Sequence, residues 1–154
     1  MSLVDIVPVT LSCDTSALAD DDVIADAQAV ANGLNLTGFG LLQSLILIDE
    51  DDQKQDVDIL FFSGSGALGT ENSAASITDA NAREYLGKVS IFIADYIDLG
   101  GVAVAQAANV GLLLKGISGT PTTFYVGAIC RSGTPTYTAA GLKLRLGIVG
   151  AGGS

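Results

Sequence analysis

The carboxylates between Leu45 and Phe62 are the residues of this chain whose type and spacing could do chemistry. The stretch LILIDEDDQKQDVDILFF sets six acids between two apolar runs, and these acids are Asp49, Glu50, Asp51, Asp52, Asp56 and Asp58. Neighbouring carboxylates can bind a hard cation such as Ca²⁺, or can share acid and base roles when one of them lies in an apolar pocket. Three interpretations follow: a metal site, a catalytic pair, or the charged tip of a hairpin.

The spacing of these acids does not match a calcium-binding EF-hand loop. Counted from Asp49, the sixth position is Lys54, where such a loop needs Gly, and the twelfth is Leu60, where it needs a bidentate Glu. A looser surface calcium site on Asp49, Asp51 and Asp52 stays open as an alternative. We expect instead a solvated hairpin tip that keeps two apolar strands soluble, with no metal site and no cofactor.

The absence of histidine narrows the remaining chemistry. Without histidine there is no Ser-His-Asp or Cys-His arrangement and no HExxH zinc site, and the commonest general base near neutral pH is missing. The two cysteines, Cys13 and Cys130, form no CxxC pair, and we expect two buried thiols rather than a disulfide. We therefore predict that the protein is not an enzyme and has no catalytic residues.

A glycine motif and four tyrosines offer two further ligand-binding hypotheses. Gly64, Gly66 and Gly69 have the GxGxxG spacing of a dinucleotide-binding turn, but no convincing helix follows them, so we expect a loop between strands. An exposed row of tyrosines could bind sugars, but with aromatic residues at only 6% of the chain, core or interface packing is the favoured role. The four tyrosines are Tyr85, Tyr96, Tyr125 and Tyr137.

Length and charge exclude several classes of protein. The chain has 154 residues, which suits one domain, and 16% of them are charged, against about 25% in a typical domain. The net charge is −10 and the seven basic residues are scattered, which argues against binding to nucleic acid. No apolar run approaches the roughly 18 residues of a membrane helix, and the N-terminus has no signal-peptide pattern, so we expect neither a membrane-spanning helix nor export by the signal-peptide route.

Short apolar segments separated by turn residues predict a protein made mainly of strands. Period-two alternation or continuous apolar runs indicate seven strands, at residues 7–14, 41–49, 56–63, 88–97, 109–117, 121–131 and 136–149. Pro8 cannot donate a ladder hydrogen bond, so the first of these strands should lie at a sheet edge or start late. Residues 20–33 fit either an N-capped helix or an extended segment, with the extended form slightly favoured.

One short helix is predicted, capped by Thr78 or Asp79 and ended by Gly87, with Tyr85 and Leu86 facing inward. No alternation of strands with long helices appears, which excludes an α/β sheet. The predicted fold is a two-layer antiparallel β-sandwich, jelly-roll-like, with one short helix. We expect residues 1–150 to form a single domain and residues 151–154 to be a flexible C-terminal tail.

Three segments, CDTSALADDDVIADAQAV, LLQSLILIDEDDQ and GTPTYTAAGLKLRLGIV, carry a resemblance to a known group. Together with residues 69–101, they resemble small proteins encoded beside the major capsid protein in tailed bacteriophages. The resemblance covers nearly the whole chain and implies a virion head component of the decoration or cement type. Members of that group commonly form trimers on the outside of the capsid lattice and reinforce it. The resemblance carries no functional residues.

The resemblance implies a bacteriophage structural protein, a capsid decoration or cement protein that stabilises the phage head. Its partners would be the major capsid protein and itself, with a homotrimer favoured, and no nucleic acid or membrane. It would be made in the host cytoplasm and reside on the outer capsid surface of the virion. Two alternatives remain: a tail- or head-fibre-associated virion protein, and a carbohydrate- or calcium-binding β-sandwich adhesion module.

Overall fold

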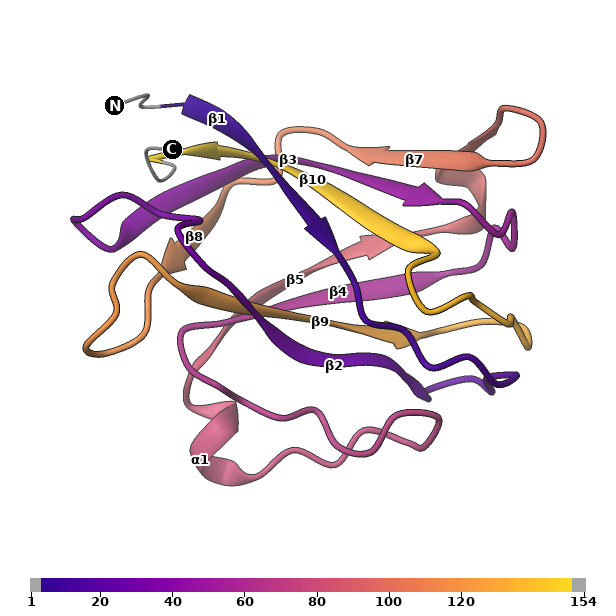
Figure 1. Cartoon of the computed structure of the whole chain (residues 1–154), viewed down its shortest axis with the longest axis horizontal. Helices are drawn as coiled ribbons and strands as arrows, with labels where there is room; N and C mark the ends of the chain where they lie inside the picture. Colours follow the sequence, from indigo (N-terminus) through magenta and orange to yellow (C-terminus); the bar gives the residue numbers. More distant parts are fainter. Residues whose placement is uncertain (1–3, 151–154) are drawn as a thin grey trace.

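Ten strands in two antiparallel sheets build the protein (Figure 1), and the computed structural model describes residues 4–150. The strands are β1 (Val4–Thr10), β2 (Val23–Val30), β3 (Phe39–Asp49), β4 (Val57–Phe62), β5 (Tyr85–Ile91), β6 (Tyr96–Asp98), β7 (Ala103–Ala107), β8 (Leu112–Lys115), β9 (Phe124–Cys130) and β10 (Leu142–Val149). The helical elements are α1 (Asp79–Ala82) and the 3-10 turn η1 (Ile93–Asp95). Within residues 4–150, neither helical element is long and apolar enough to cross a bilayer.

The strand order is that of a jelly roll. Sheet A has the order β1-β10-β3-β7-β6, with β8 paired to the other half of β3, and sheet B has the order β2-β9-β4-β5. With β6 and β8 set aside, the chain crosses between two four-stranded sheets at every connection except β4–β5, and its last strand lies between its first and its third, as in two nested Greek keys. The prediction of a two-layer, jelly-roll-like β-sandwich is confirmed.

The main core lies between the two sheets. Sheet A contributes alternate leucines of β3 and β10, such as Leu45 and Leu144, which are at most 1% exposed. Sheet B contributes Phe61 and Phe124, whose rings lie 6.2 Å apart between centroids. Alternate residues of each strand point to opposite faces of a sheet, so the period-two pattern in the sequence selects these inward residues. Cys13 and Cys130 are free, buried thiols, as predicted.

Both ends of sheet A finish in strands that are poor templates for further pairing. β1 pairs with β10 alone among the described strands, and Pro8 removes one amide donor from it, which confirms the expected edge position. At the other end, β6 has only three residues. Short edge strands and edge proline are common protections against uncontrolled strand addition.

Two local predictions were wrong, and the open alternative for residues 20–33 is resolved. The helix ends at Ala82 and not before Gly87; Tyr85 already starts β5, and Gly87 has a φ of +145° where the β4–β5 register shifts. Strand β7 was missed, because alanines and a glutamine give AVAQA little apolar contrast. Residues 23–30 form β2, so the extended alternative is confirmed over the helix. The predicted C-terminal tail, residues 151–154, lies outside the described residues.

The hairpin predicted around the acidic stretch does not exist. β3 belongs to sheet A and β4 to sheet B, so residues 50–56 cross from one layer to the other. The crossing explains why both flanking runs are apolar without alternation. The half of each run that faces the core is covered by the other sheet. The outward half of the β4 run is covered by residues 63–84, whereas the outward half of the β3 run has no such cover within residues 4–150.

Candidate functional site

The acidic loop of residues 50–56 is the first candidate; Glu50 is exposed and residues 51–56 are half-buried, next to a buried Asp49. Asp49 is 0% exposed, which contradicts the expectation of a wet tip. One of its carboxylate oxygens accepts a hydrogen bond from the Asp51 amide at 3.1 Å, and the other accepts from the Gln53 and Lys54 amides at 2.8 Å each. Burial raises the pKa of Asp49, and these three backbone hydrogen bonds offset part of the increase. The carboxylate thus shapes the turn.

The other members of the proposed calcium site also have partners. Asp51 accepts hydrogen bonds from the backbone and hydroxyl of Thr138 at 2.8 and 3.2 Å. Lys54 bridges Asp52 and Asp98 at 3.1 and 3.0 Å. Asp52 and Lys54 both have φ near +53°, the left-handed conformation that this tight turn requires. Among the described residues, no group of three or more acids, cysteines or histidines is arranged to hold a metal ion.

The last acid of the stretch, Asp58, lies in sheet B and is 4% exposed. It accepts from Ser90 at 2.6 Å, from Arg131 at 2.8 Å and from Lys88 at 3.2 Å. Burial alone would raise the pKa of Asp58, but these hydrogen bonds outweigh it and the pKa is lowered. Two cations and a hydroxyl hold the carboxylate ionised, so it is a structural anchor of sheet B and not a poised acid.

The glycine motif and the tyrosines do not form ligand sites of the kind considered from the sequence. Gly64, Gly66 and Gly69 lie in the loop between β4 and α1, as expected for a connection between strands. Of the tyrosines, Tyr137 is 1% exposed and Tyr96 donates a hydrogen bond from its hydroxyl to the Gln55 carbonyl at 2.7 Å. The packing role predicted for the tyrosines is confirmed for these two.

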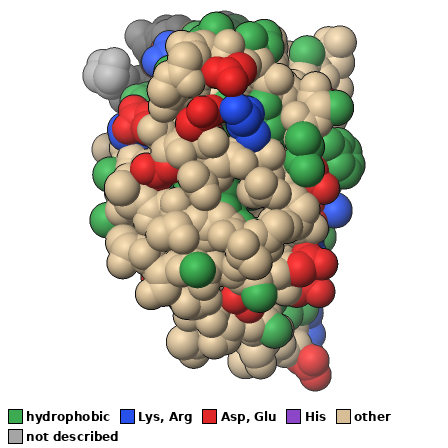
Figure 2. Space-filling model, turned by 90° about the vertical axis from the view of Figure 1, so that its right-hand side faces the viewer, with side chains coloured by type: hydrophobic (Ala, Val, Ile, Leu, Met, Phe, Trp, Pro, Cys, Tyr) green, Lys and Arg blue, Asp and Glu red, His purple; other side chains and the backbone are tan. Residues whose placement is uncertain are grey.

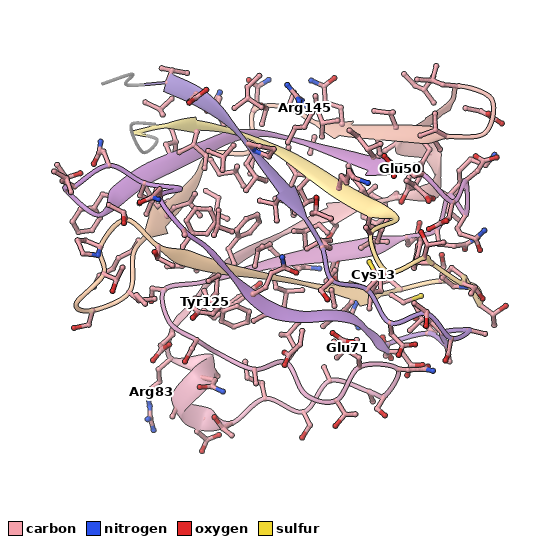
Figure 3. The ribbon with its side chains drawn as sticks, in the orientation of Figure 1. Cys13, Glu50, Glu71, Arg83, Tyr125 and Arg145 are labelled. Atoms are coloured by element: carbon pink, nitrogen blue, oxygen red, sulfur yellow. The ribbon has the colours of Figure 1, made fainter. Side chains whose placement is uncertain are left out.

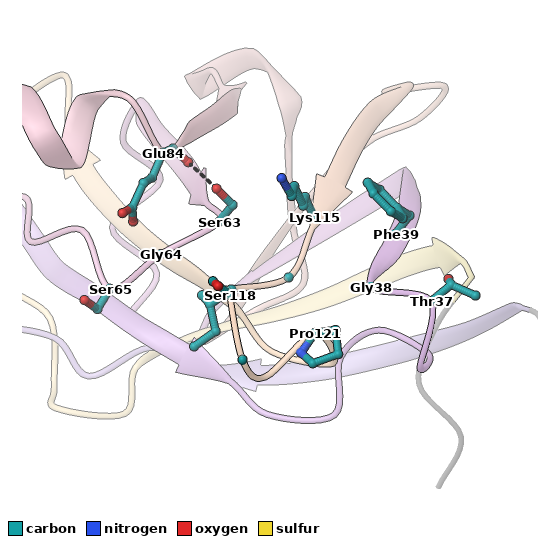
Figure 4. Close-up of a pocket in the computed structure, with 13 residues that line it drawn as sticks. Thr37, Gly38, Phe39, Ser63, Gly64, Ser65, Glu84, Lys115, Ser118 and Pro121 are labelled. Atoms are coloured by element: carbon teal, nitrogen blue, oxygen red, sulfur yellow. Dashed lines mark hydrogen bonds between the residues drawn. The ribbon is translucent and has the colours of Figure 1, made fainter.

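A groove of about 680 Å³ opens at the end of the sandwich opposite the acidic loop (Figure 4). Serine and threonine hydroxyls, glycine backbone and two charged side chains, Glu84 and Lys115, line it. Phe39, which is 62% exposed, forms one rim, and Ser63 donates to the Glu84 carbonyl on the other side. This volume falls within the range of small-molecule sites. Sequence reasoning missed the groove, because its lining comes from segments far apart in the chain.

The outer surface of sheet B is covered by its own chain. Residues 63–84, the covering segment, run beneath the sheet in Figure 1 and include α1. Leu68 of this segment is 1% exposed and joins Phe62, Val23 and Ile129 in a second apolar cluster. The Leu68 amide also donates to Asp26 at 2.7 Å. A small apolar hollow of about 250 Å³ remains between the segment and the sheet.

The outer surface of sheet A has no such cover among residues 4–150. Register places alternate residues of its strands on this side, and we call them the outer face. Most are apolar, and several are well exposed: Ile6 50%, Phe39 62%, Ile97 64%, Leu113 73% and Val149 42%. Figure 2 shows hydrophobic side chains along the top and upper right of the molecule, where sheet A lies. Large exposed apolar patches on proteins commonly mark interaction surfaces.

Comparisons with known proteins add little to this geometry. No protein-family model and no curated protein matches the sequence. A chain of the solved structure "Desmodium yellow mottle tymovirus" is 14% identical, over 98% of this chain and 82% of that chain, with a TM-score of 0.28. A chain of "Structure of a marine algae virus of the order Picornavirales" is 9% identical, over 97% of this chain and 62% of that one, with a TM-score of 0.20. Scores this low carry no argument, so the fold rests on the strand order itself.

Proposed function

We propose that this protein is a structural component of a virus particle, a decoration or cement protein bound to the outside of the major capsid protein lattice of a phage head. The sequence resemblance to small proteins encoded beside major capsid proteins supports the proposal. The jelly-roll strand order is compatible with it, since viral capsid domains are among the users of this fold. Lectins and cupins use the fold as well, so this second support is one of analogy.

The observation that carries the proposal is the exposed apolar outer face on a stiff sandwich. A protein that reinforces a lattice needs a rigid body and apolar surface for neighbours, and it needs no catalytic group. Here the core is closed by two paired sheets, and apolar side chains of sheet A remain exposed. The acids that could have suggested catalysis are engaged in turns and ion pairs. A binding role therefore fits these residues better than an enzymatic one.

The charge of the chain favours the outside of the particle. Packaged DNA presents phosphates to the inner capsid surface, and a protein of net charge −10 would be repelled there. On the outer surface, many copies repeated over the lattice can each bind weakly and still be retained, because contacts to neighbours add through avidity. Major capsid protein and neighbouring copies of this chain are the proposed partners.

Particles purified from the virus that encodes this chain test the proposal directly. Mass spectrometry should find the protein in particles that have been banded by density, and electron microscopy should show a sandwich-sized density on the outside of the head. Heads from which the protein has been deleted should lose that density and should open at lower temperature. A protein found in infected-cell lysate but absent from banded particles would overturn the proposal. Density on the tail or on a head fibre would favour the tail- or fibre-associated alternative.

A second candidate, carbohydrate binding, is favoured by the groove beside Phe39. Sugars bind where hydroxyl and charged groups lie next to an exposed aromatic ring, and this groove combines both. A glycan array with the purified protein tests it, with Phe39→Ala as the variant and Phe92→Ala as its control. Phe92 is 57% exposed and does not line the groove. Signals lost in the first variant and kept in the second support a sugar site, and an array without signals removes it.

A further inference from the structure

The outer face of sheet A differs from the rest of the surface in charge as well as in polarity. Its outward positions carry three basic residues, Lys115, Lys143 and Arg145, and no acid among the described residues of its strands. The chain has 17 acids and seven basic residues, so all the acids and only four of the basic residues lie elsewhere. An apolar and cationic face thus sits on a body that is otherwise strongly acidic.

Two of these cations have no ion pair within residues 4–150. Lys143 is paired with Glu50 at the margin of the face, but neither Lys115 nor Arg145 lies within ion-pair distance of a described acid. In Figure 3, Arg145 projects from the outer side of sheet A, away from the sandwich. The outer face therefore presents unpaired positive charge next to exposed apolar side chains such as Leu113 and Ile97.

The complementary surface is present on the same molecule. The loops of residues 11–22, 50–56 and 131–141 meet at one end of the sandwich, the right-hand end in Figure 1, and we call this the loop end. These loops contain two basic residues, Lys54 and Arg131, and the acids Asp14, Asp20, Asp21, Asp22, Glu50, Asp51, Asp52 and Asp56. Figure 2 looks onto this end, and its charged side chains are mainly acidic.

We propose that the outer face of sheet A docks a second copy of this chain, which contacts it with its loop end. Face-to-face packing of two outer faces would oppose like charges, whereas face-to-loop-end packing pairs opposite charges and covers the apolar residues. Such a contact is heterologous, since each copy uses two different surfaces. It closes into a ring where the rotation between copies permits closure, and otherwise continues as a filament.

The inference deepens the proposed function, on which it rests, by assigning one surface to contacts between copies. The exposed apolar residues Phe92 and Ile93, beside η1, and Leu99, after β6, are assigned to neither of these two surfaces. Contacts between copies form without a particle, so they are measured on the purified chain. Binding of the protein to virus particles is measured separately. A negative result for self-association does not imply a negative result for particle binding, and the reverse also holds.

Sedimentation of the purified chain and of matched charge variants is the first test. Arg145→Glu should raise the dissociation constant for self-association at least about tenfold, because it puts an acid on a face that meets acids. Arg83→Glu changes the net charge equally, but Arg83 projects from α1 on the opposite side of the molecule (Figure 3), and self-association should be unchanged. A monomeric wild-type chain at all concentrations, or equal weakening by both variants, would overturn the proposal.

An apolar pair of variants gives the same comparison without charge. Leu113→Ser on the outer face should weaken self-association roughly tenfold through lost apolar burial. Leu36→Ser should leave it unchanged, since Leu36 lies in the β2–β3 loop with nearly the same exposure, 76% against 73%. Equal effects of the two substitutions would contradict the assignment of the face.

Carbodiimide cross-linking identifies the partner surface. This reagent joins a lysine amine to a carboxylate in direct contact, and a mixture of ¹⁵N-labelled and unlabelled chains distinguishes links between copies from links within one. We expect links between copies from Lys115 to acids of the loop end. Links between copies from Lys115 only to acids elsewhere, or none in a chain that sedimentation shows to be associated, would overturn the loop end as the partner.

Discussion

The outer surfaces of the two sheets have opposite arrangements. Sheet B buries its outward residues Phe62 and Ile129 beneath the covering segment of its own chain, and ties Asp58 to two cations there. Sheet A leaves outward residues such as Phe39 and Leu113 exposed, next to Lys115 and Arg145, which have no ion pair within residues 4–150. The sandwich is thus covered by its own chain on the outer side of sheet B, whereas within residues 4–150 it is uncovered on the outer side of sheet A.

The difference separates residues that stabilise the monomer from residues available for binding. Outward apolar residues of sheet B contribute to the free energy of folding, because a single chain buries them. Outward apolar residues of sheet A contribute less to it, because several of them stay exposed to water in the single chain. Matched substitutions on the two surfaces can therefore confirm or refute this division, and four predictions follow in order of expected size.

The largest difference is expected between two phenylalanines. Phe62→Ala should lower the free energy of unfolding by about 3–5 kcal/mol, because the side chain is 0% exposed and leaves a cavity. Phe39→Ala should change it by less than about 0.5 kcal/mol, since Phe39 is 62% exposed. Urea denaturation of both variants at a protein concentration where the chain is monomeric measures the difference. Similar losses in both would mean that the outer face of sheet A is not a free surface.

The second comparison is between a leucine of the covering segment and a leucine of the outer face of sheet A. Leu68→Ala in the covering segment should cost about 2–3 kcal/mol, since Leu68 is 1% exposed and anchors the segment on sheet B. The variant should also make residues 63–84 more sensitive to limited proteolysis. Leu113→Ala should leave both measurements close to the wild type. A covering segment that is cleaved as fast in the wild type as in the variant would contradict a fixed cover.

The ionic anchor of sheet B gives a smaller effect. Asp58→Asn should lower the free energy of unfolding by about 1–2 kcal/mol, because Arg131 and Lys88 lose their charged partner but stay partly exposed to water. Asp98→Asn at the edge of sheet A is the control, and its effect should be smaller, since that side chain is 56% exposed. Thermal unfolding of the two variants in the same buffer compares them, and a larger loss for Asp98→Asn would refute the anchor.

The pH dependence of Asp58 gives the smallest predicted effect. The pKa of Asp58 is lowered in the folded protein, so its carboxylate stabilises the fold above the unfolded-state pKa of about 4 and this contribution is lost as the pH falls through the folded-state pKa. The stability difference between wild type and Asp58→Asn should therefore be largest near pH 7 and should shrink at pH 3. A difference that stays constant over this range would mean that packing and not charge produces it.

The local alternation of residues was enough to predict most strands and their inward faces. Leu142, Leu144, Leu146 and Ile148 alternate in the sequence, and all four are at most 1% exposed. The pattern did not predict elements in which apolar and polar positions differ little in hydrophobicity, as in the alanine-rich β7. It also did not predict turns that depend on residues far away in the sequence. Gly87 looked like a helix end, because glycine suits both a helix C-terminus and the register shift that it occupies in β5.

The acidic stretch shows the limit of sequence reasoning about a site. Its composition predicted a wet loop, and its ligand spacing correctly separated it from an EF-hand. Nothing local indicated that Asp49 would be buried, because the Thr138 loop that covers residues 50–56 lies far along the chain. The groove beside Phe39 was invisible for the same reason, since its lining joins residues 37–39, 63–65 and 115–121.

The sequence alone determined that this chain forms strands, buries its two thiols and carries a strongly acidic balance, because these properties depend on residue type and on a period of two. The tertiary structure decided which apolar residues are covered. An outward leucine or phenylalanine of a strand has the same local pattern in sheet A as in sheet B. Only the path of residues 63–84, which pass beneath sheet B, divides them into residues that a single chain buries and residues that stay exposed within residues 4–150.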